Sequence, residues 1–366
     1  MRTAIKFLCD MTTPRLSSIK NRQVGSHSIK PATELAPADT EVLLSNKDEY
    51  RKLCEIESSI PIFSRDWWLD ATAGPDGWDV ALVKTNDRII GAMPYATGLR
   101  FGMKVINQPA LTPRLGPWLL PGEGKTGTKL ANEQKIMQSL IHQLPPFDHF
   151  TQTWNTDQTN WLPFYWNGFN QTTQYTYVLP QLDDADALWS GLDGAIRTVC
   201  KKGTDRFKLT VRDDLSVDAL IALHWMTLQR RGISAKYSKD YIRRLDAACA
   251  KRNCRKIFIV VNEEGRHCAG TYIVWDANSA YGLLNGVDPE MRNTGALTLG
   301  KWEAVKFSAQ VSQKFDFVGN MNETIEPSVR GFGAMQMPIF SISKTPSRLL
   351  RLRRGLQSVF NAKNAA

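Results

Sequence analysis

The sequence has no long hydrophobic segment, and this shortage excludes two classes of protein. No apolar run within the 366 residues reaches the ~18 residues that a membrane-spanning helix needs. The first residues, Met1 onward, have too short an apolar core for a secretory signal and no small-residue cleavage site after it. We therefore expect a soluble, cytoplasmic protein, which could also contact the inner face of a membrane peripherally.

Cysteine is also sparse, and the six that occur form no Cys-x-x-Cys pair. They are Cys9, Cys54, Cys200, Cys249, Cys254 and Cys268. This scatter favours free thiols in a reducing compartment over a disulfide framework. Cys249, Cys254, Cys268 and His267 match no known spacing of zinc ligands, so no metal site is predicted.

Basic residues exceed acidic ones by 10, but the surplus lies at the ends of the chain. Residues 1–30 carry a net charge of +5 and residues 344–366 carry +6, which leaves −1 for the rest. A protein that reads duplex DNA needs its basic residues on the folded surface. The distribution therefore argues against duplex DNA as a partner.

The order of elements expected in the first half recurs in the second. Each half has helical segments, a β-hairpin (78–95 and 256–274), a helix (129–144 and 296–310) and a strand that begins with Phe-Asp. The first half adds helices at 47–58 and after Ser64, which we expect to cap the second of them, and the second half adds helices at 216–230 and 239–251.

This repeat of about 180 residues, the span from Gly91 to Gly270, indicates a duplicated α/β domain. The alternative is that any α/β protein shows hairpin, helix and strand in this order. We expect a leader at 1–40, lobes at 41–180 and 181–344, each with a mixed sheet flanked by helices, and a basic tail at 345–366.

The second half ends in an extended pattern that resembles a known family. Phe315-Asp-Phe-Val-Gly, followed by Met-Asn-Glu-Thr-Ile-Glu and by Arg330, Phe332 and Gly333, is similar to the strand, glycine turn and basic-x-Phe-Gly element of the Fem-like transferases. These are tandem members of the GNAT superfamily. The resemblance runs from about residue 41 to 344 and implies an acyl or aminoacyl transferase, with an acceptor that is an amino sugar or another cell-envelope glycan precursor, free or linked to a lipid.

A second resemblance concerns the donor. GNAT enzymes hold the donor pyrophosphate at a helix N-terminus, where unpaired N–H groups and the helix dipole favour anions. Arg292, Gly295 and Ala296 match this turn, but Leu297 departs from it, which weighs against acyl-CoA and leaves aminoacyl-tRNA open. Gly319 and Asn320 are expected to add backbone N–H groups. No tightly bound cofactor is predicted.

Residues 151–179 combine many aromatic side chains with Asn, Gln and Thr and a single charge, Asp157. Flat rings with amide partners suit a hydroxyl-rich ligand such as a sugar, and an aromatic interface between the two lobes explains the run equally well. As acceptor-binding residues we take Trp154, Trp161, Trp166, Tyr175 and Tyr281.

Direct acyl transfer needs a base for one proton and a donor for the oxyanion. Asp316 and Glu326 are candidates for the base, and Arg330 for the positive charge, although Asp316 could cap a turn and Glu326 could pair with Arg330 at i,i+4. His224 lies on the apolar stripe of its helix and is expected to be a satisfied core histidine.

Two further segments complete the hypothesis. The glycine-rich stretch Gly122 to Gly127 has Leu119 where a phosphate-binding loop needs glycine, so a surface loop is expected. Residues 347–363 can form a helix with one apolar and one basic face, which suits an anionic membrane. A terminal helix that docks on its own domain would use the same apolar stripe. The rival to a transferase is a GNAT-like module that binds a glycan without catalysis.

Overall fold

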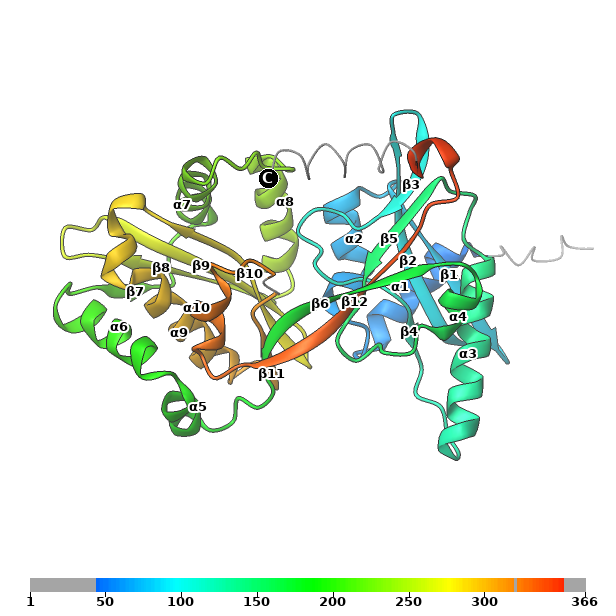
Figure 1. Cartoon of the computed structure of the whole chain (residues 1–366), viewed down its shortest axis with the longest axis horizontal. Coiled ribbons are helices and arrows are strands. Elements are labelled where there is room, and N and C mark those ends of the chain that lie inside the picture. The colour runs from blue at the N-terminus through cyan, green and yellow to red at the C-terminus, as the bar shows by residue number, and fades with distance from the viewer. Residues whose placement is uncertain (1–43, 319–320, 352–366) are drawn as a thin grey trace, which may run out of the picture. The chain divides into compact units, whose positions relative to one another are not determined.

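The computed structural model describes residues 44–318 and 321–351 (Figure 1). The predicted leader at 1–40 and the tail from residue 352 onward lie outside the described residues, as do Gly319 and Asn320. Among the residues described, no helix combines the length and the apolar character that crossing a bilayer demands.

Helices and strands alternate through both halves of the chain. The first half contains α1 (Asn46–Ile56), η1 (Ile62–Ser64), α2 (Asp66–Ala73), β1 (Trp78–Thr85), β2 (Arg88–Arg100), β3 (Met103–Asn107), β4 (Trp118–Leu119), α3 (Thr126–His142), β5 (His149–Thr153), α4 (Leu162–Trp166) and β6 (Asn170–Leu179). The second half contains α5 (Ala185–Gly191), α6 (Gly194–Asp205), β7 (Thr210–Arg212), α7 (Val217–Arg230), α8 (Lys239–Ala250), β8 (Arg255–Val261), β9 (His267–Trp275), β10 (Ser279–Val287), η2 (Pro289–Thr294), α9 (Ala296–Ser308), β11 (Lys314–Asp316), α10 (Glu326–Arg330) and β12 (Met335–Lys344).

The strands of the two halves join in one mixed sheet of twelve strands. Its order is β1-β2-β3-β5-β12-β6-β11-β10-β9-β8-β7, with β4 paired to β2. The α/β fold with a mixed sheet flanked by helices is confirmed, but the sheets of the two halves are continuous. They become continuous because β6 and β12, which pair along residues 170–178 and 335–343, bridge them in the middle (Figure 1).

The order of strands reads the same from β1 and from β8. The hairpin β1–β2 corresponds to β8–β9, β3 to β10, α3 to α9 and β5 to β11, and the pairs β3–β5 and β10–β11 are both parallel. Each half gives its last strand to the other, because β6 pairs with β11 and β12 pairs with β5. This symmetry of topology supports duplication, and the boundaries at 180 and 344 stay predictions.

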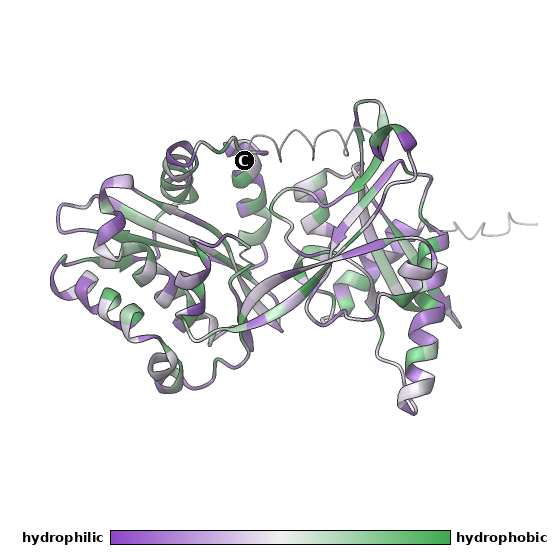
Figure 2. Cartoon of the chain, viewed as in Figure 1, coloured by the Kyte–Doolittle hydropathy of each residue, from purple (hydrophilic) through white to green (hydrophobic). Residues whose placement is uncertain are grey.

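The two β-hairpins predicted from the sequence are present in the structure as β1–β2 and β8–β9. Asn86 and Asp87 connect β1 to β2 with φ of 50° and 61°, which are the left-handed conformations that a tight two-residue turn needs and that Asn and Asp tolerate. The strands β8 and β9 consist largely of hydrophobic residues (Figure 2), because side chains on both faces of this hairpin are buried.

The hydrophobic core continues from one half into the other. Phe63 and Trp68 of the first half pack in the same cluster as Leu245 of α8 and Tyr281 of β10. The rings of Phe63 and Tyr281 lie 4.6 Å apart in an edge-on arrangement. The halves therefore share apolar surface as well as strands.

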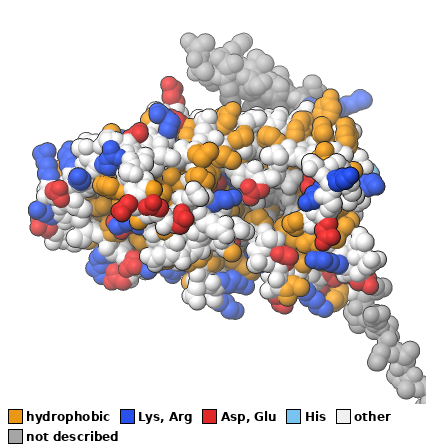
Figure 3. All heavy atoms as spheres, turned by 90° about the horizontal axis from the view of Figure 1, so that it is seen from below, with side chains coloured by type: hydrophobic (Ala, Val, Ile, Leu, Met, Phe, Trp, Pro, Cys, Tyr) orange, Lys and Arg blue, Asp and Glu red, His pale blue; other side chains and the backbone are white. Residues whose placement is uncertain are grey.

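Some local predictions differ from the structure. Ser64 does not cap α2: the N-cap is Arg65, with no side-chain hydrogen bond, because Ser64 is buried and its carbonyl accepts a hydrogen bond from Tyr50. The five described cysteines are free, as expected, and all five are buried. The predicted surface loop is exposed, but it is shorter than expected, because Thr126 and Gly127 already belong to α3. On the face shown in Figure 3, Lys and Arg side chains are interspersed with Asp and Glu.

Candidate active site

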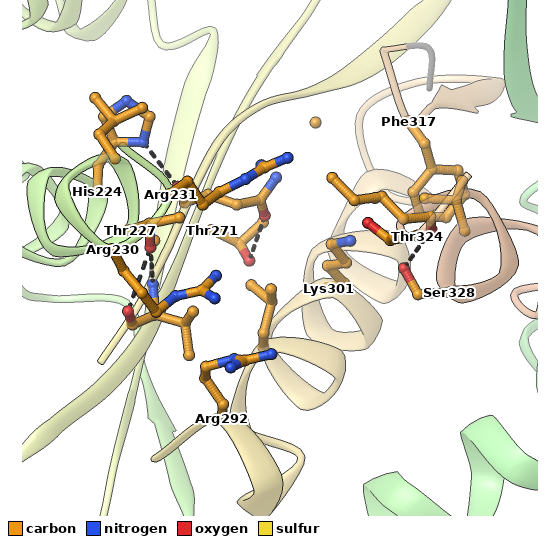
Figure 4. Close-up of a pocket in the computed structure, with 18 of the residues that line it drawn as sticks. His224, Thr227, Arg230, Arg231, Thr271, Arg292, Lys301, Phe317, Thr324 and Ser328 are labelled. Carbon is orange, nitrogen blue, oxygen red and sulfur yellow. Dashed lines mark hydrogen bonds between the residues drawn. The ribbon is translucent and has the colours of Figure 1, made fainter. Parts of the chain in front are cut away.

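A cavity of about 580 Å³ opens in the second half where two parallel strands part. β10 and β11 pair only over Ser279–Tyr281 and Lys314–Asp316. Beyond this point β10 continues to Val287, while the chain of β11 turns away. The cavity lies between these strands, α7, α9 and α10 (Figure 4), and we call it the arginine cavity after its most prominent side chains.

Close backbone packing brings α7 to the edge of this cavity. A Cβ atom on Gly286 of β10 would lie 2.4 Å from the backbone nitrogen of His224, so only glycine permits this approach. The hydroxyl of Thr227 accepts a hydrogen bond from the backbone N–H of Val287 at 2.8 Å, which fixes the helix on the strand. The end of α7 therefore holds Arg230 and Arg231 beside the cavity.

Four cationic side chains line the arginine cavity. They are Arg230, Arg231, Arg292 and Lys301, and Figure 4 shows their charged ends turned toward the same space. No carboxylate is among the lining residues, and none of these four side chains forms an ion pair or hydrogen bond with a described residue. Unpaired positive charges gathered in a concave site favour an anionic ligand.

Lys301 has the most perturbed environment of the four. Burial raises the cost of its charged form and lowers the pKa of the amine to about 8. An amine with this pKa is partly neutral near pH 7 and can accept a proton. Lys301 is not among the residues predicted from the sequence, although a signal was present: it lies four residues after Leu297 and four before Val305, on an otherwise apolar stripe of α9.

The turn before α9 has the form that the sequence predicts. Gly295 adopts a left-handed conformation with φ of 85°, and α9 begins at Ala296. Arg292 and Leu297 line the cavity, whereas Ala296 is fully buried and Gly295 packs against Val199 of α6. The turn thus places Arg292 at the cavity, and Gly295 and Ala296 shape the backbone behind it.

His224 also lines the cavity, and both of its ring nitrogens have partners. Nδ1 lies 2.8 Å from the carbonyl oxygen of Asn285, so it carries the proton, and Nε2 lies 2.9 Å from the hydroxyl of Tyr237. Burial lowers the pKa of the imidazole, which keeps it neutral. The prediction of a satisfied histidine is confirmed.

The carboxylate of Asp316 lies elsewhere. Its neighbours Phe315 and Phe317 line the arginine cavity, but the Asp316 side chain is not among the lining residues. It is buried and pairs with Arg114 at 3.3 Å, accepts a hydrogen bond from the Val318 backbone at 2.7 Å, and bonds Thr176. Asp316 and Arg114 therefore form a buried ion pair that joins the two halves.

The predicted pair Glu326 and Arg330 is present but does not line the cavity. Its α10 neighbours Ile325, Ser328 and Val329 do, so the helix directs Glu326 and Arg330 to a different side. Glu326 accepts hydrogen bonds from Tyr177 at 2.5 Å and from Arg330 at 3.0 Å. The bond from Tyr177 lowers the pKa of this carboxyl, which makes it a weak base.

The predicted acceptor-binding aromatics do not form one surface. Trp154 is fully buried against Phe164, and Tyr281 is buried among core side chains. Trp161 packs partly buried against the first-half core, whereas Trp166 and Tyr175 are exposed. The structure therefore brings none of the five to the arginine cavity, and the aromatic run is divided between core and surface.

Comparison with known proteins gives a match to a family model in one region and a similar fold for most of the chain. Residues 192–323 match the family model described as an acetyltransferase (GNAT) domain. The crystal structure of FemX superposes with a TM-score of 0.61 at 11% identity, covering 82% of this chain and 96% of that chain. Among curated proteins, none matches this sequence.

Two further solved structures superpose less closely. The C-terminal domain of a putative lysylphosphatidylglycerol synthetase from Agrobacterium fabrum gives a TM-score of 0.49 at 12% identity, covering 82% of this chain and 92% of that chain. A tandem GNAT protein from the clavulanic acid biosynthesis pathway gives 0.43 at 15% identity, covering 74% and 85%.

Proposed function

We propose that the arginine cavity binds an acyl donor, because residues 192–323 match the model of a GNAT acetyltransferase domain and the fold is similar to that of FemX. The proposed reaction transfers the acyl group to an amine or hydroxyl of an amino sugar or another cell-envelope glycan precursor. The acceptor class rests on the resemblance to Fem-like transferases. An acyl-CoA is the donor we favour over aminoacyl-tRNA.

The observation that carries the proposal is the charge of the cavity at the parting of β10 and β11. Arg230, Arg231 and Arg292 would contact the phosphates of the donor, with Arg292 beside the start of α9. Phe315 and Phe317 provide an apolar wall for the chain that carries the acyl group. Leu297, which departs from the GNAT turn, lines this cavity, and a volume of about 580 Å³ remains beside it.

Backbone geometry supplies a means of stabilising the oxyanion. The register of β10 with β9 shifts between Gly282 and Leu284, so Leu283 has no partner in the ladder. Such a bulge leaves backbone groups unpaired. Because Gly282 lines the cavity, we propose that an N–H group at the bulge donates to the acyl oxygen as it becomes negative.

Lys301 is the residue that we propose as proton acceptor. The acceptor nitrogen or oxygen forms a bond to the acyl carbon, the bond from that carbon to the donor sulfur breaks, and the acceptor loses one proton. Neutral Lys301 accepts this proton, and CoA leaves as its thiolate. We propose Lys301 for this role in place of Asp316, Glu326 and Arg330 because none of those three is among the lining residues of the cavity.

Calorimetric titration with acetyl-CoA, followed by thiol release in the presence of a panel of amino sugars, tests the proposal. We expect acetyl-CoA to bind and Arg292→Ala to weaken it about tenfold, while Arg88→Ala, which removes an exposed arginine in the other half, has no effect. Binding of tRNA in place of acetyl-CoA would overturn the choice of donor. Affinity for a glycan with turnover of neither donor would favour the non-catalytic module.

Residues 348–351 are helical, and they begin the segment for which we propose contact with an anionic membrane. Leu349 of this turn is exposed, while the rest of the predicted apolar stripe lies outside the described residues. Such contact would bring the protein to a lipid-linked acceptor. Sedimentation with anionic vesicles, comparing the full chain with one that ends at Lys344, tests this proposal, and equal binding by both would contradict it.

A further inference from the structure

A second cavity, of about 460 Å³, opens in the first half at the point that corresponds to the arginine cavity. β3 and β5 pair in parallel over only Val105–Ile106 and His149–Phe150 and then part, as β10 and β11 do. The cavity lies between the two segments that follow, 115–121 and 154–160, and residues of the segment 59–64 and one residue of α3 complete its lining. We call it the Trp154 cavity.

Two buried N–H donors of this cavity have no partner among the described residues. They are Nε1 of Trp154, whose side chain is fully buried, and Nδ2 of Asn160. A buried donor left without an acceptor costs about 1–3 kcal/mol. A bound molecule with suitably placed oxygen atoms would remove that cost.

The orientation of the Trp154 ring is fixed by its neighbours. Gly116 lies so close that a Cβ atom there would be 2.5 Å from Cδ1 and 3.1 Å from Nε1 of the ring. On another side the ring packs edge-on against Phe164 at 4.8 Å. Gly116, itself a lining residue, and Phe164 therefore hold the indole ring in place at the cavity.

The charge of the Trp154 cavity is opposite to that of the arginine cavity. Its lining includes the carboxylates Glu133 and Asp157 and no lysine or arginine. Glu133, from α3, is partly buried and forms no ion pair or hydrogen bond with a described residue. Asp157 is exposed and has one distant cation, Lys314, at 3.9 Å. Phosphates would be repelled, and a cationic group would be attracted.

We propose that the Trp154 cavity binds a hydroxyl-rich molecule that carries a protonated amine, such as an unphosphorylated amino sugar. Oxygen atoms of the ligand accept hydrogen bonds from Trp154 and Asn160, and its ammonium group lies against Glu133. This binding does not depend on acyl transfer, because the two cavities share no lining residue. If the protein does transfer an acyl group, this site would hold a sugar unit away from the reacting atoms.

The test follows the indole N–H resonances of the ¹⁵N-labelled full chain, with Trp154→Phe used to assign the signal of Trp154. We expect D-glucosamine to shift that signal, D-glucose to bind at least threefold more weakly, and glucose 6-phosphate to leave it unmoved. Equal binding of glucose and glucosamine, or a shift by glucose 6-phosphate, would overturn the proposal. So would the absence of any shift with glucosamine.

A pair of matched variants tests the role of the carboxylate. Glu133→Gln should weaken glucosamine binding at least threefold, whereas Glu263→Gln, which removes the same charge from an exposed turn, should not. Acetyl-CoA titration of both variants shows that the second half is intact. An unchanged glucosamine affinity in Glu133→Gln would contradict the proposal, and failure of acetyl-CoA to bind any form of the chain would count against the donor site alone.

Discussion

The arginine cavity and the Trp154 cavity occupy corresponding places in the two halves, but their linings differ in charge. Each opens where two parallel strands part, and each takes one ionisable side chain from the helix that connects those strands. That side chain is Lys301 on α9 in one half and Glu133 on α3 in the other. The same backbone opening is thus lined by side chains of opposite charge in the two halves, which suits the opposite ligands that we propose for them.

The two halves that carry these cavities are joined by shared strands and by a buried ion pair. The last strand of each half pairs with a strand of the other half, because β6 pairs with β11 and β12 pairs with β5. Each half therefore depends on the other to complete the sheet that carries its cavity. Arg114, in the segment that leads to the Trp154 cavity, pairs with Asp316, whose neighbours line the arginine cavity. Changes at this pair should therefore affect both cavities.

The largest effect is expected for Asp316→Ala, which would leave the buried Arg114 without its counter-charge. Breaking a buried ion pair by removing one partner costs about 3–5 kcal/mol. We expect the free energy of unfolding, measured by urea denaturation, to fall by this amount in a single transition. Two separate transitions would show that the halves unfold independently, and Asp157→Ala, at an exposed and distant pair, is the control.

Lys301→Met should lower kcat about 100-fold at pH 7, which is the usual contribution of a general base. In the unchanged chain, kcat should rise with pH and level off above about 8, where the amine is neutral. The profile of the Met variant should be flat in this range. A pH profile of the Met variant identical to that of the unchanged chain would show that Lys301 is not the base. Unchanged binding of glucosamine to the Met variant would show that the substitution affects the arginine cavity and not the Trp154 cavity.

The same variant has an opposite effect on stability. In the folded chain the pKa of Lys301 is about 8, below its ordinary value of 10.5, so folding is opposed by the buried charge at pH 7. Replacement by Met should raise the free energy of unfolding by about 1–3 kcal/mol at pH 7. The gain should diminish as the pH rises from 8 toward 10.5, because the lysine becomes neutral in both states. Thermal unfolding at pH 7 and pH 9.5 measures this.

A smaller effect is expected for Arg231→Ala, which removes one of three guanidinium groups from the proposed phosphate contacts. The Michaelis constant for acetyl-CoA should rise about three- to tenfold with kcat nearly unchanged, since a charged hydrogen bond contributes about 1.5 kcal/mol in an exposed setting. Lys236→Ala, an exposed cation five residues further along, serves as the control. An equal loss in both would indicate a general charge effect and not a specific contact.

The fold was more predictable from the sequence than the site. Hairpins and amphipathic helices depend on local patterns, and Asn86-Asp87 specifies its turn without help from the rest of the chain. The exchange of β6 and β12 depends on contacts more than 140 residues apart, which no local pattern reports. Trp154 illustrates the same limit, because an aromatic residue in a polar run can face either the core or a ligand.

The smallest effect is expected for Arg330→Ala. This variant tests whether the role implied by the family resemblance or the position seen in the structure describes Arg330 correctly. The family pattern gives this position a basic residue, but here its side chain is exposed and pairs with Glu326 at 3.0 Å on the side of α10 away from the arginine cavity. Exposed pairs contribute about 0–1 kcal/mol, so turnover should change less than twofold and the Tm only slightly. Tyr177 still donates to Glu326, which keeps α10 in place. A folded variant that loses more than tenfold in turnover would contradict this expectation. It would mean that α10 rotates when substrate binds, and that the reaction needs the positive charge of Arg330 and not that of Arg292.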